Sequence, residues 1–264
     1  MRAYRTLARM AWSTVLVYRG EFLLQLAGVA VQTVALFAVW RALFAADPGG
    51  EMAGLTWEQM KAYLFVAFLA GTLLSSFTDG QVALRVLDGS VAIDLLRPID
   101  YQVARFAETI GYLVGELLVV AVMGSVLLLA FGGMPLPDPT QAGLFLLSLL
   151  AMVPLKFALV YLVGLACFWT GNFHGLSMSR IAITNILSGA LVPIALYPDW
   201  LQTICAWSPF PGIVSTPALI FLGQVRGTES LYLIGVQVLW VAVLWTGARL
   251  LWRVAVRRLV VHGG

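Results

Sequence analysis

The chain has 264 residues, of which 61% are hydrophobic and only 11% are charged, with a formal net charge of +3. Soluble domains carry roughly a quarter charged residues, so this chain has too few polar groups to cover a surface that faces water. The composition excludes a soluble enzyme, a nucleic-acid-binding domain and a disordered chain, and it predicts an integral membrane protein.

Residues 1–20 predict an amphipathic helix that lies on the membrane surface. Arg2, Arg5 and Arg9 recur at intervals of three and four residues, with apolar residues between them. This spacing puts the three arginines on one face of a helix, as in helices that rest in the plane of a membrane interface.

Six apolar segments predict transmembrane helices, because a helix needs about 20 apolar residues to cross the hydrocarbon core of a bilayer. The six predicted spans cover about residues 22–45, 60–77, 107–131, 141–169, 179–197 and 231–252. We therefore expect an all-α, polytopic membrane protein in which residues 1–264 form a single transmembrane domain.

The link between the second and third spans, residues 79–107, interleaves apolar residues with both signs of charge. This mixture favours a docking surface for a cytoplasmic partner, and the alternative is a solvated loop with a short surface helix. The candidate docking residues in the link are Arg85, Asp88, Asp94, Arg97 and Pro98.

Two ionisable residues lie well inside predicted spans. Glu116 is nine residues past Ala107, about 14 Å into the third span, and Lys156 is thirteen residues before Trp169, about 20 Å from the same face. Charges at such depth are costly and usually face a partner or a water-filled cavity. The candidate roles are a structural ion pair between Glu116 and Lys156, or a part in substrate or proton movement.

Small residues and prolines mark two further features. Gly111 and Gly115 continue a four-residue spacing that begins at Ala107, which predicts close helix packing along the third span. Residues 198–228 are apolar but broken by three prolines, so we expect a re-entrant or interfacial hairpin there rather than a seventh span.

Arginines set the predicted orientation. They gather in residues 1–20, in the link and near the end of the chain, whereas Arg41, Lys61 and Arg226 fall on the other side of the membrane. Because basic residues favour the cytoplasmic side, both termini are predicted to be cytoplasmic.

No nucleotide-binding loop, zinc motif or paired-cysteine motif occurs in the sequence, so we expect no catalytic residues and no metal site. Cys167 and Cys205 lie near opposite faces of the predicted membrane protein. They are therefore expected to be two free thiols in apolar surroundings, with no disulfide between them.

Several stretches resemble the membrane subunits of ABC-2-type ABC transporters, in a bacterial branch of that family. The similar stretches are YRGEFLLQLAG (18–28), GSVAIDLLRPID (89–100), FWTGN (168–172), LSGALVPIALYPDWL (187–201) and LLWRVAVRRLVVHGG (250–264). From the first stretch to the last they span residues 18–264, so the resemblance extends over nearly the whole chain.

The resemblance implies a permease with six spans, an N-terminal interfacial helix, a coupling helix in the link and short re-entrant helices before the last span. It also implies a second, identical or related permease and two partner ATPase subunits, which would hold ATP and magnesium. The expected function is therefore an exporter permease of the bacterial inner membrane that hydrolyses no ATP itself and binds no nucleic acid. Arg5 and Arg9 would form a second contact with the ATPase.

Two other function classes remain open from the sequence. One is a proton-coupled secondary transporter that uses Glu116 as its proton site and needs no ATPase. The other is an assembly or receptor protein that transports nothing, although the expected lack of a folded domain outside the membrane weighs against it.

Overall fold

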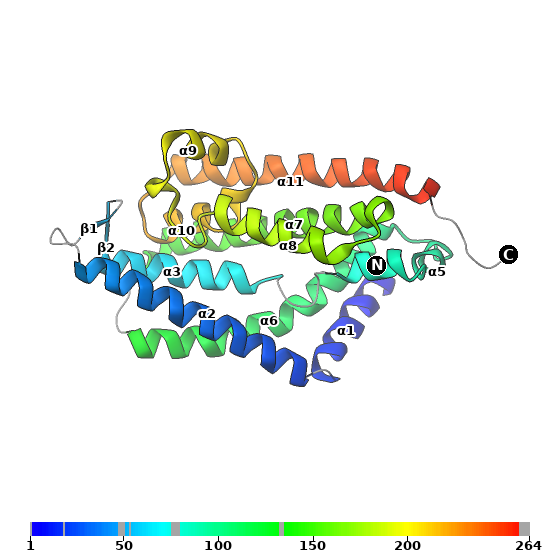
Figure 1. Cartoon of the computed structure of the whole chain (residues 1–264), viewed down its shortest axis with the longest axis horizontal. Helices are drawn as coiled ribbons and strands as arrows, with labels where there is room; N and C mark the ends of the chain where they lie inside the picture. Colours follow the sequence, from blue (N-terminus) through cyan, green and yellow to red (C-terminus); the bar gives the residue numbers. More distant parts are fainter. Residues whose placement is uncertain are drawn as a thin grey trace.

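The computed structural model describes residues 2–17, 19–46, 51–52, 54–74, 80–131 and 135–258. Long helices lie side by side along one axis of the molecule (Figure 1). Within the described residues the only sheet is a hairpin of β1 (Glu51–Met52) and β2 (Leu55–Thr56), which pair antiparallel. The prediction of an all-α membrane protein is confirmed.

Four helices in the described part of the chain are long and apolar enough to cross a membrane. They are α2 (Arg19–Ala46), α6 (Tyr101–Phe131), α7 (Pro139–Thr170) and α11 (Thr228–Ala255). They match the predicted first, third, fourth and sixth spans. Asp138 caps the start of α7, and the helix runs through Pro154 without interruption.

Shorter helices occupy the predicted second and fifth spans. α3 (Trp57–Thr72) has 16 residues and α8 (Phe173–Leu187) has 15. At 1.5 Å per residue they measure about 24 and 22 Å, less than the roughly 30 Å of a hydrocarbon core. Six full crossings therefore stay a prediction. The last residues of the predicted second span, 75–77, lie outside the described residues.

The core lies where α3, α7 and α11 meet α10 (Ser215–Phe221). Its largest fully buried side chains are aromatic and aliphatic and come mainly from α3 and α7. They include Tyr63, Tyr161, Phe157, Met60, Leu155 and Met152. Because α3 contributes many of these side chains, its position is fixed by packing despite its short length.

The predicted hairpin at residues 198–228 consists of short helices: α9 (Asp199–Ala206), η2 (Phe210–Gly212) and α10, preceded by η1 (Ile194–Leu196). The Gln237 side chain of α11 donates to the Gly212 carbonyl oxygen at 2.7 Å and accepts from the Ser148 hydroxyl at 3.0 Å. These bonds hold η2 against α7 and α11. A re-entrant path through a membrane stays a prediction.

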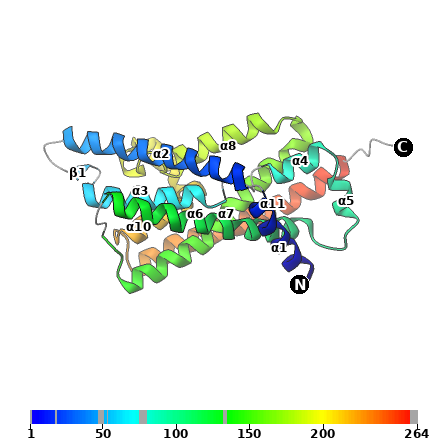
Figure 2. The same ribbon diagram turned by 90° about the horizontal axis from the view of Figure 1, so that it is seen from below.

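α1 (Arg2–Val17) packs across the first half of α6, as Figure 2 shows from below. A Cβ added at Gly111 would lie 2.1 Å from the Ala8 carbonyl oxygen and 2.8 Å from the Ala11 Cβ. Only glycine allows this approach, so the close packing predicted for this part of α6 is found at Gly111.

Candidate functional site

The link between α3 and α6 folds into two short helices, α4 (Gln81–Leu87) and α5 (Val91–Leu95). Gly89 separates them with a φ of +76°, a conformation that favours glycine. Val82 of α4 packs against Gly164 of α7, where an added Cβ would come within 2.9 Å of the valine side chain. The predicted start of the link, Asp79, lies outside the described residues.

The link, the start of α1 and the end of α11 lie at one end of the molecule, opposite α9 and α10 (Figure 1). The candidate docking residues are therefore gathered at the end that also receives both terminal helices. The outer segment predicted at 198–228 is at the far end.

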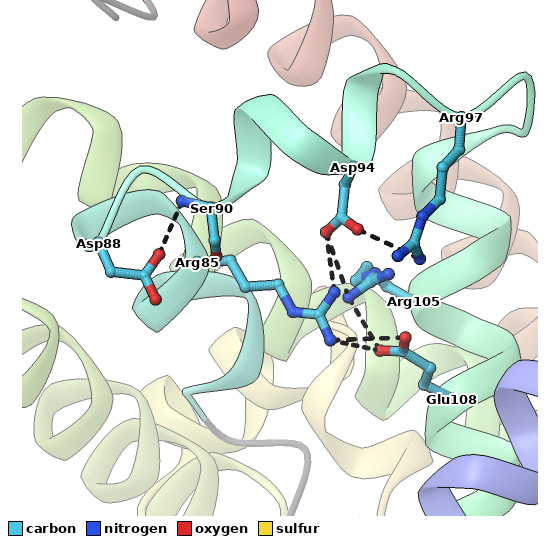
Figure 3. Close-up of polar contacts among 7 residues, drawn as sticks. All are labelled: Arg85, Asp88, Ser90, Asp94, Arg97, Arg105 and Glu108. Carbon is cyan, nitrogen blue, oxygen red and sulfur yellow. Dashed lines mark hydrogen bonds and ion pairs between the residues drawn. The ribbon is translucent and has the colours of Figure 1, made fainter. Parts of the chain in front are cut away.

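Asp94 of α5 is the centre of an ionic cluster (Figure 3). Its carboxylate lies 2.8 Å from the Arg85 guanidinium of α4, 3.5 Å from Arg97 and 3.7 Å from Arg105 of α6. The Asp94 side chain is only 9% exposed. Asp94 is thus turned inward, toward arginines of its own chain.

Glu108 of α6 completes this cluster. Its carboxylate accepts from Arg85 at 3.2 Å and lies 2.9 Å from the Arg105 guanidinium, whose side chain is 3% exposed. Arg85 therefore bridges α4 to α5 and to α6. Removing one partner from such a buried set leaves an uncompensated charge, which is strongly destabilising.

Other predicted docking residues are exposed. The Arg97 side chain is 52% exposed although it pairs with Asp94, and the next residue, Pro98, is also exposed. Asp88 is exposed and accepts the Ser90 backbone N–H at 2.8 Å. Hydrogen bonds from the Ser90 hydroxyl and then its backbone N–H lower the pKa of Asp88 below its usual range.

Five apolar side chains of the link are exposed as well, and two of them directly precede Asp88 and Arg97 in the chain. The five are Leu84, Leu87, Ile93, Leu95 and Leu96, and Leu96 is 83% exposed. An apolar group with charges at its edge is typical of a protein-binding surface. We call these five residues the apolar link surface.

The start of α6 also joins the first and last helices of the chain. The Asp100 backbone N–H donates to the Tyr4 hydroxyl of α1 at 3.3 Å, and the Asp100 carboxylate lies 3.4 Å from Arg249 of α11. Tyr101 stacks on Trp252 of α11, with ring centroids 4.2 Å apart. Arg5 and Arg9 are exposed on α1.

Glu116 and Lys156 are both buried and meet at the end of α3. The Lys156 ammonium donates to the carbonyl oxygens of Ala70 at 2.8 Å, Gly71 at 3.1 Å and Leu73.

The Glu116 carboxylate accepts a hydrogen bond from the backbone N–H of Leu74, the residue after Leu73, at 2.5 Å. Leu74 has a φ of +56°, which is uncommon for a residue with a side chain. Glu116 and Lys156 therefore bind the same backbone segment at the end of α3. A direct ion pair between Glu116 and Lys156 stays a prediction.

Arg105 and Glu108 are the functional candidates that sequence reasoning missed. In the sequence, Arg105 is one of the arginines of the link that indicate the cytoplasmic side, and no pattern assigns a role to Glu108. The available signal was their spacing of three residues at the start of a helix, which places opposite charges side by side.

Comparison with known protein families identifies the family of this chain. Residues 30–263 match a family described as ABC-2 family transporter protein. No curated protein matches the chain. The family match covers most of the chain and confirms the resemblance seen in the sequence.

Proposed function

Because the chain belongs to the ABC-2 transporter family, we propose that it is the membrane-spanning permease subunit of an ATP-driven exporter. Two ATPase subunits would bind this permease at the cytoplasmic face and hold ATP and magnesium, and this chain would hydrolyse no ATP. A second permease, identical or related, would complete the translocation path. The complex would lie in the bacterial inner membrane with both termini of this chain in the cytoplasm.

The observation that supports this role is the ionic cluster that joins the link to α6. The apolar link surface, with Asp88 and Arg97 at its edge, would bind the ATPase. Movement of α4 and α5 would then pull on α6 through Asp94 and Glu108. Asp94 is thus a positioning residue in this proposal, and Arg5 and Arg9 of α1 would form the second contact.

The proposal is tested by placing a charge on the apolar link surface. Leu96→Glu is expected to reduce co-purification of an ATPase expressed from the neighbouring gene by about tenfold, because a charge would replace an apolar contact. The matched control is Leu136→Glu, since Leu136 is 80% exposed in the segment between α6 and α7, and α6 ends on the side of the molecule away from the link (Figure 1). Equal recovery of the ATPase with both variants would contradict the docking role.

A proton-coupled secondary transporter is the competing function. It would use Glu116, yet the Glu116 carboxylate is engaged by the Leu74 backbone N–H, which favours a structural role. The two functions differ in one requirement. Transport in the secondary transporter would continue without any ATPase, whereas transport by the permease would stop.

A further inference from the structure

A small cavity lies where α4, α6 and α7 meet, and the Arg105 and Glu108 side chains of the ionic cluster form part of its wall. Its volume is about 10 Å³. Every residue that lines it is buried except Gln81, which is half-buried at the start of α4. A space of about 10–15 Å³ is the smallest that holds one water molecule, so the cavity admits water and excludes organic ligands.

Two buried polar atoms belong to residues that line this cavity, namely Nε of Arg105 on α6 and the hydroxyl oxygen of Tyr161 on α7. Arg105 is 3% exposed and Tyr161 is 0% exposed. Within the part of the chain that the structure describes, neither atom has a hydrogen-bond partner. A buried donor without a partner is destabilising, and almost all such groups in native proteins are satisfied by protein atoms or by ordered water. The two atoms therefore indicate a shared ligand in the cavity.

Acceptor oxygens line the same cavity. The Glu108 carboxylate lies 3.2 Å from Arg85 and 2.9 Å from Arg105, and these groups face one another in Figure 3. A carboxylate has about four lone-pair positions, and the two arginines do not use all of them. The Thr109 hydroxyl donates to the Arg105 carbonyl oxygen at 3.0 Å, which leaves the lone pairs of the hydroxyl oxygen available. The occupant must therefore accept hydrogen bonds from two donors and donate to at least one acceptor.

We propose that this cavity binds one ordered water molecule. The water accepts hydrogen bonds from the Arg105 Nε–H and the Tyr161 hydroxyl, and it donates to the Glu108 carboxylate or the Thr109 hydroxyl oxygen. A metal cation would lie against the Arg105 guanidinium and a halide would lie against the Glu108 carboxylate, so like charges disfavour both ions, whereas water both donates and accepts. The water joins the ionic cluster to α7, and the proposal is independent of ATP-driven transport.

Radiolytic footprinting tests the water directly, with the full chain in nanodiscs of phosphatidylcholine. The protein is equilibrated with water that carries a heavy oxygen isotope, and a short X-ray pulse converts bound water into hydroxyl radicals that react with the nearest side chain. Mass spectrometry is expected to find the heavy oxygen on Tyr161. Tyr63 is the control, because it is 2% exposed, donates to the Gly189 carbonyl oxygen at 2.8 Å and lies outside the cavity lining. Tyr63 is expected to stay unlabelled, and labelling of Tyr161 no greater than that of Tyr63 would overturn the site.

A pair of tyrosine variants measures what the water contributes. Tyr161→Phe removes one partner of the water and is expected to lower the melting temperature by about 2–4 °C, as for the loss of one hydrogen bond. Tyr101→Phe is the matched control, because the Tyr101 hydroxyl is also buried without a partner among the described residues but lies outside the cavity lining. Removing that hydroxyl is expected to leave the melting temperature unchanged or to raise it. A Tyr161→Phe protein as stable as the Tyr101→Phe protein would overturn the proposal.

Ion replacement distinguishes water from a bound ion. Exchange of chloride for gluconate and of sodium for choline is expected to leave the labelling of Tyr161 and the difference between the two variants unchanged. Dependence of either result on one of these ions would place an ion in the cavity and overturn the proposal. If Tyr161→Phe fails to fold, the labelling of Tyr161 on the native chain still decides it.

Discussion

Lys156 acts as a helix cap that comes from another helix. The last carbonyl oxygens of a helix have no partner within it, and the interior of a membrane offers no water to satisfy them. Lys156 of α7 supplies three donors to the end of α3, and its charge complements the negative end of the helix dipole. This contact explains how α3 ends after only 16 residues.

Replacing this cap is expected to destabilise the protein strongly. Lys156→Met keeps the length of the side chain but leaves buried carbonyl oxygens unsatisfied, at a cost of about 1–3 kcal/mol for each buried group left without a partner. Lys61→Met is the control, because buried Lys61 pairs with the exposed Glu58 at 2.7 Å. The melting temperature in detergent is expected to fall much further for the first variant. Similar losses in both would refute the cap.

The sequence identified Glu116 and Lys156 because charges are rare in apolar spans. It could not identify their partners, which are backbone groups of α3. No proline or other local stop signal follows Thr72 directly, so the end of α3 is set by contacts from α6 and α7. Such tertiary control of a helix end has no trace in the local sequence.

At the scale of helices, α4 and α5 are held to α6 by the ionic cluster around Asp94 and Glu108. The cluster joins groups from three helices, and two of its members, Asp94 and Arg105, are almost fully shielded from solvent. The link is therefore attached to α6 by buried charges, while several of its apolar side chains are exposed.

Asp94→Asn is expected to loosen this attachment. The variant leaves Arg85 and Arg105 with one shared carboxylate, that of Glu108, instead of two, and it removes the only carboxylate of α5 from the cluster. Amide hydrogen exchange in residues 91–95 is therefore expected to become about tenfold faster, as for a local loss of about 1.4 kcal/mol.

Arg97→Gln is the control, because Arg97 is half exposed and its single pair with Asp94 is worth little. Exchange in that variant is expected to stay near the native rate. If Asp94→Asn exchanged no faster than Arg97→Gln, the cluster would not anchor the link.

Helix boundaries show why the fifth span was predicted too late in the chain. The predicted fifth span extends to residue 197 because the run LVPIALY (191–197) is apolar. In the structure α8 ends at Leu187, before Gly189, which has a φ of +82°, and before Pro193. Its true start is marked by Asn172, whose side chain accepts the Gly175 backbone N–H. A prediction from hydropathy alone counts apolar residues and takes no account of the Asn172 cap or of the glycine and proline that follow the helix.

At the scale of the molecule, the amphipathic first helix is part of the helical assembly. α1 packs across α6 at Gly111, and Tyr4 binds the start of α6. The sequence predicted a helix that rests on the membrane surface, and its contact with α6 could not be read from the spacing of the arginines. The pairing of α1 with α6 depends on the absence of a single side chain.

Gly111→Ala is expected to displace α1 from α6. The new methyl group would overlap the Ala8 carbonyl oxygen, and such overpacking costs about 1–3 kcal/mol. Gly143→Ala on α7 has open space and is expected to be neutral or slightly stabilising. Thermal unfolding and proteolysis within α1 measure the difference. A Gly111→Ala protein as stable as the Gly143→Ala protein would disprove the close crossing.

The contacts between α11 and the start of α6 have a consequence for biosynthesis. Asp100, Tyr101 and Gln102 contact Arg249, Trp252 and the Trp245 carbonyl oxygen, respectively, and Tyr101 and Trp252 are 151 residues apart in the sequence (252 − 101). A ribosome makes α11 after every other long helix, so these contacts form last during membrane insertion. The start of α6, which directly follows the link, therefore gains its contacts with α11 only when the final long helix is in place.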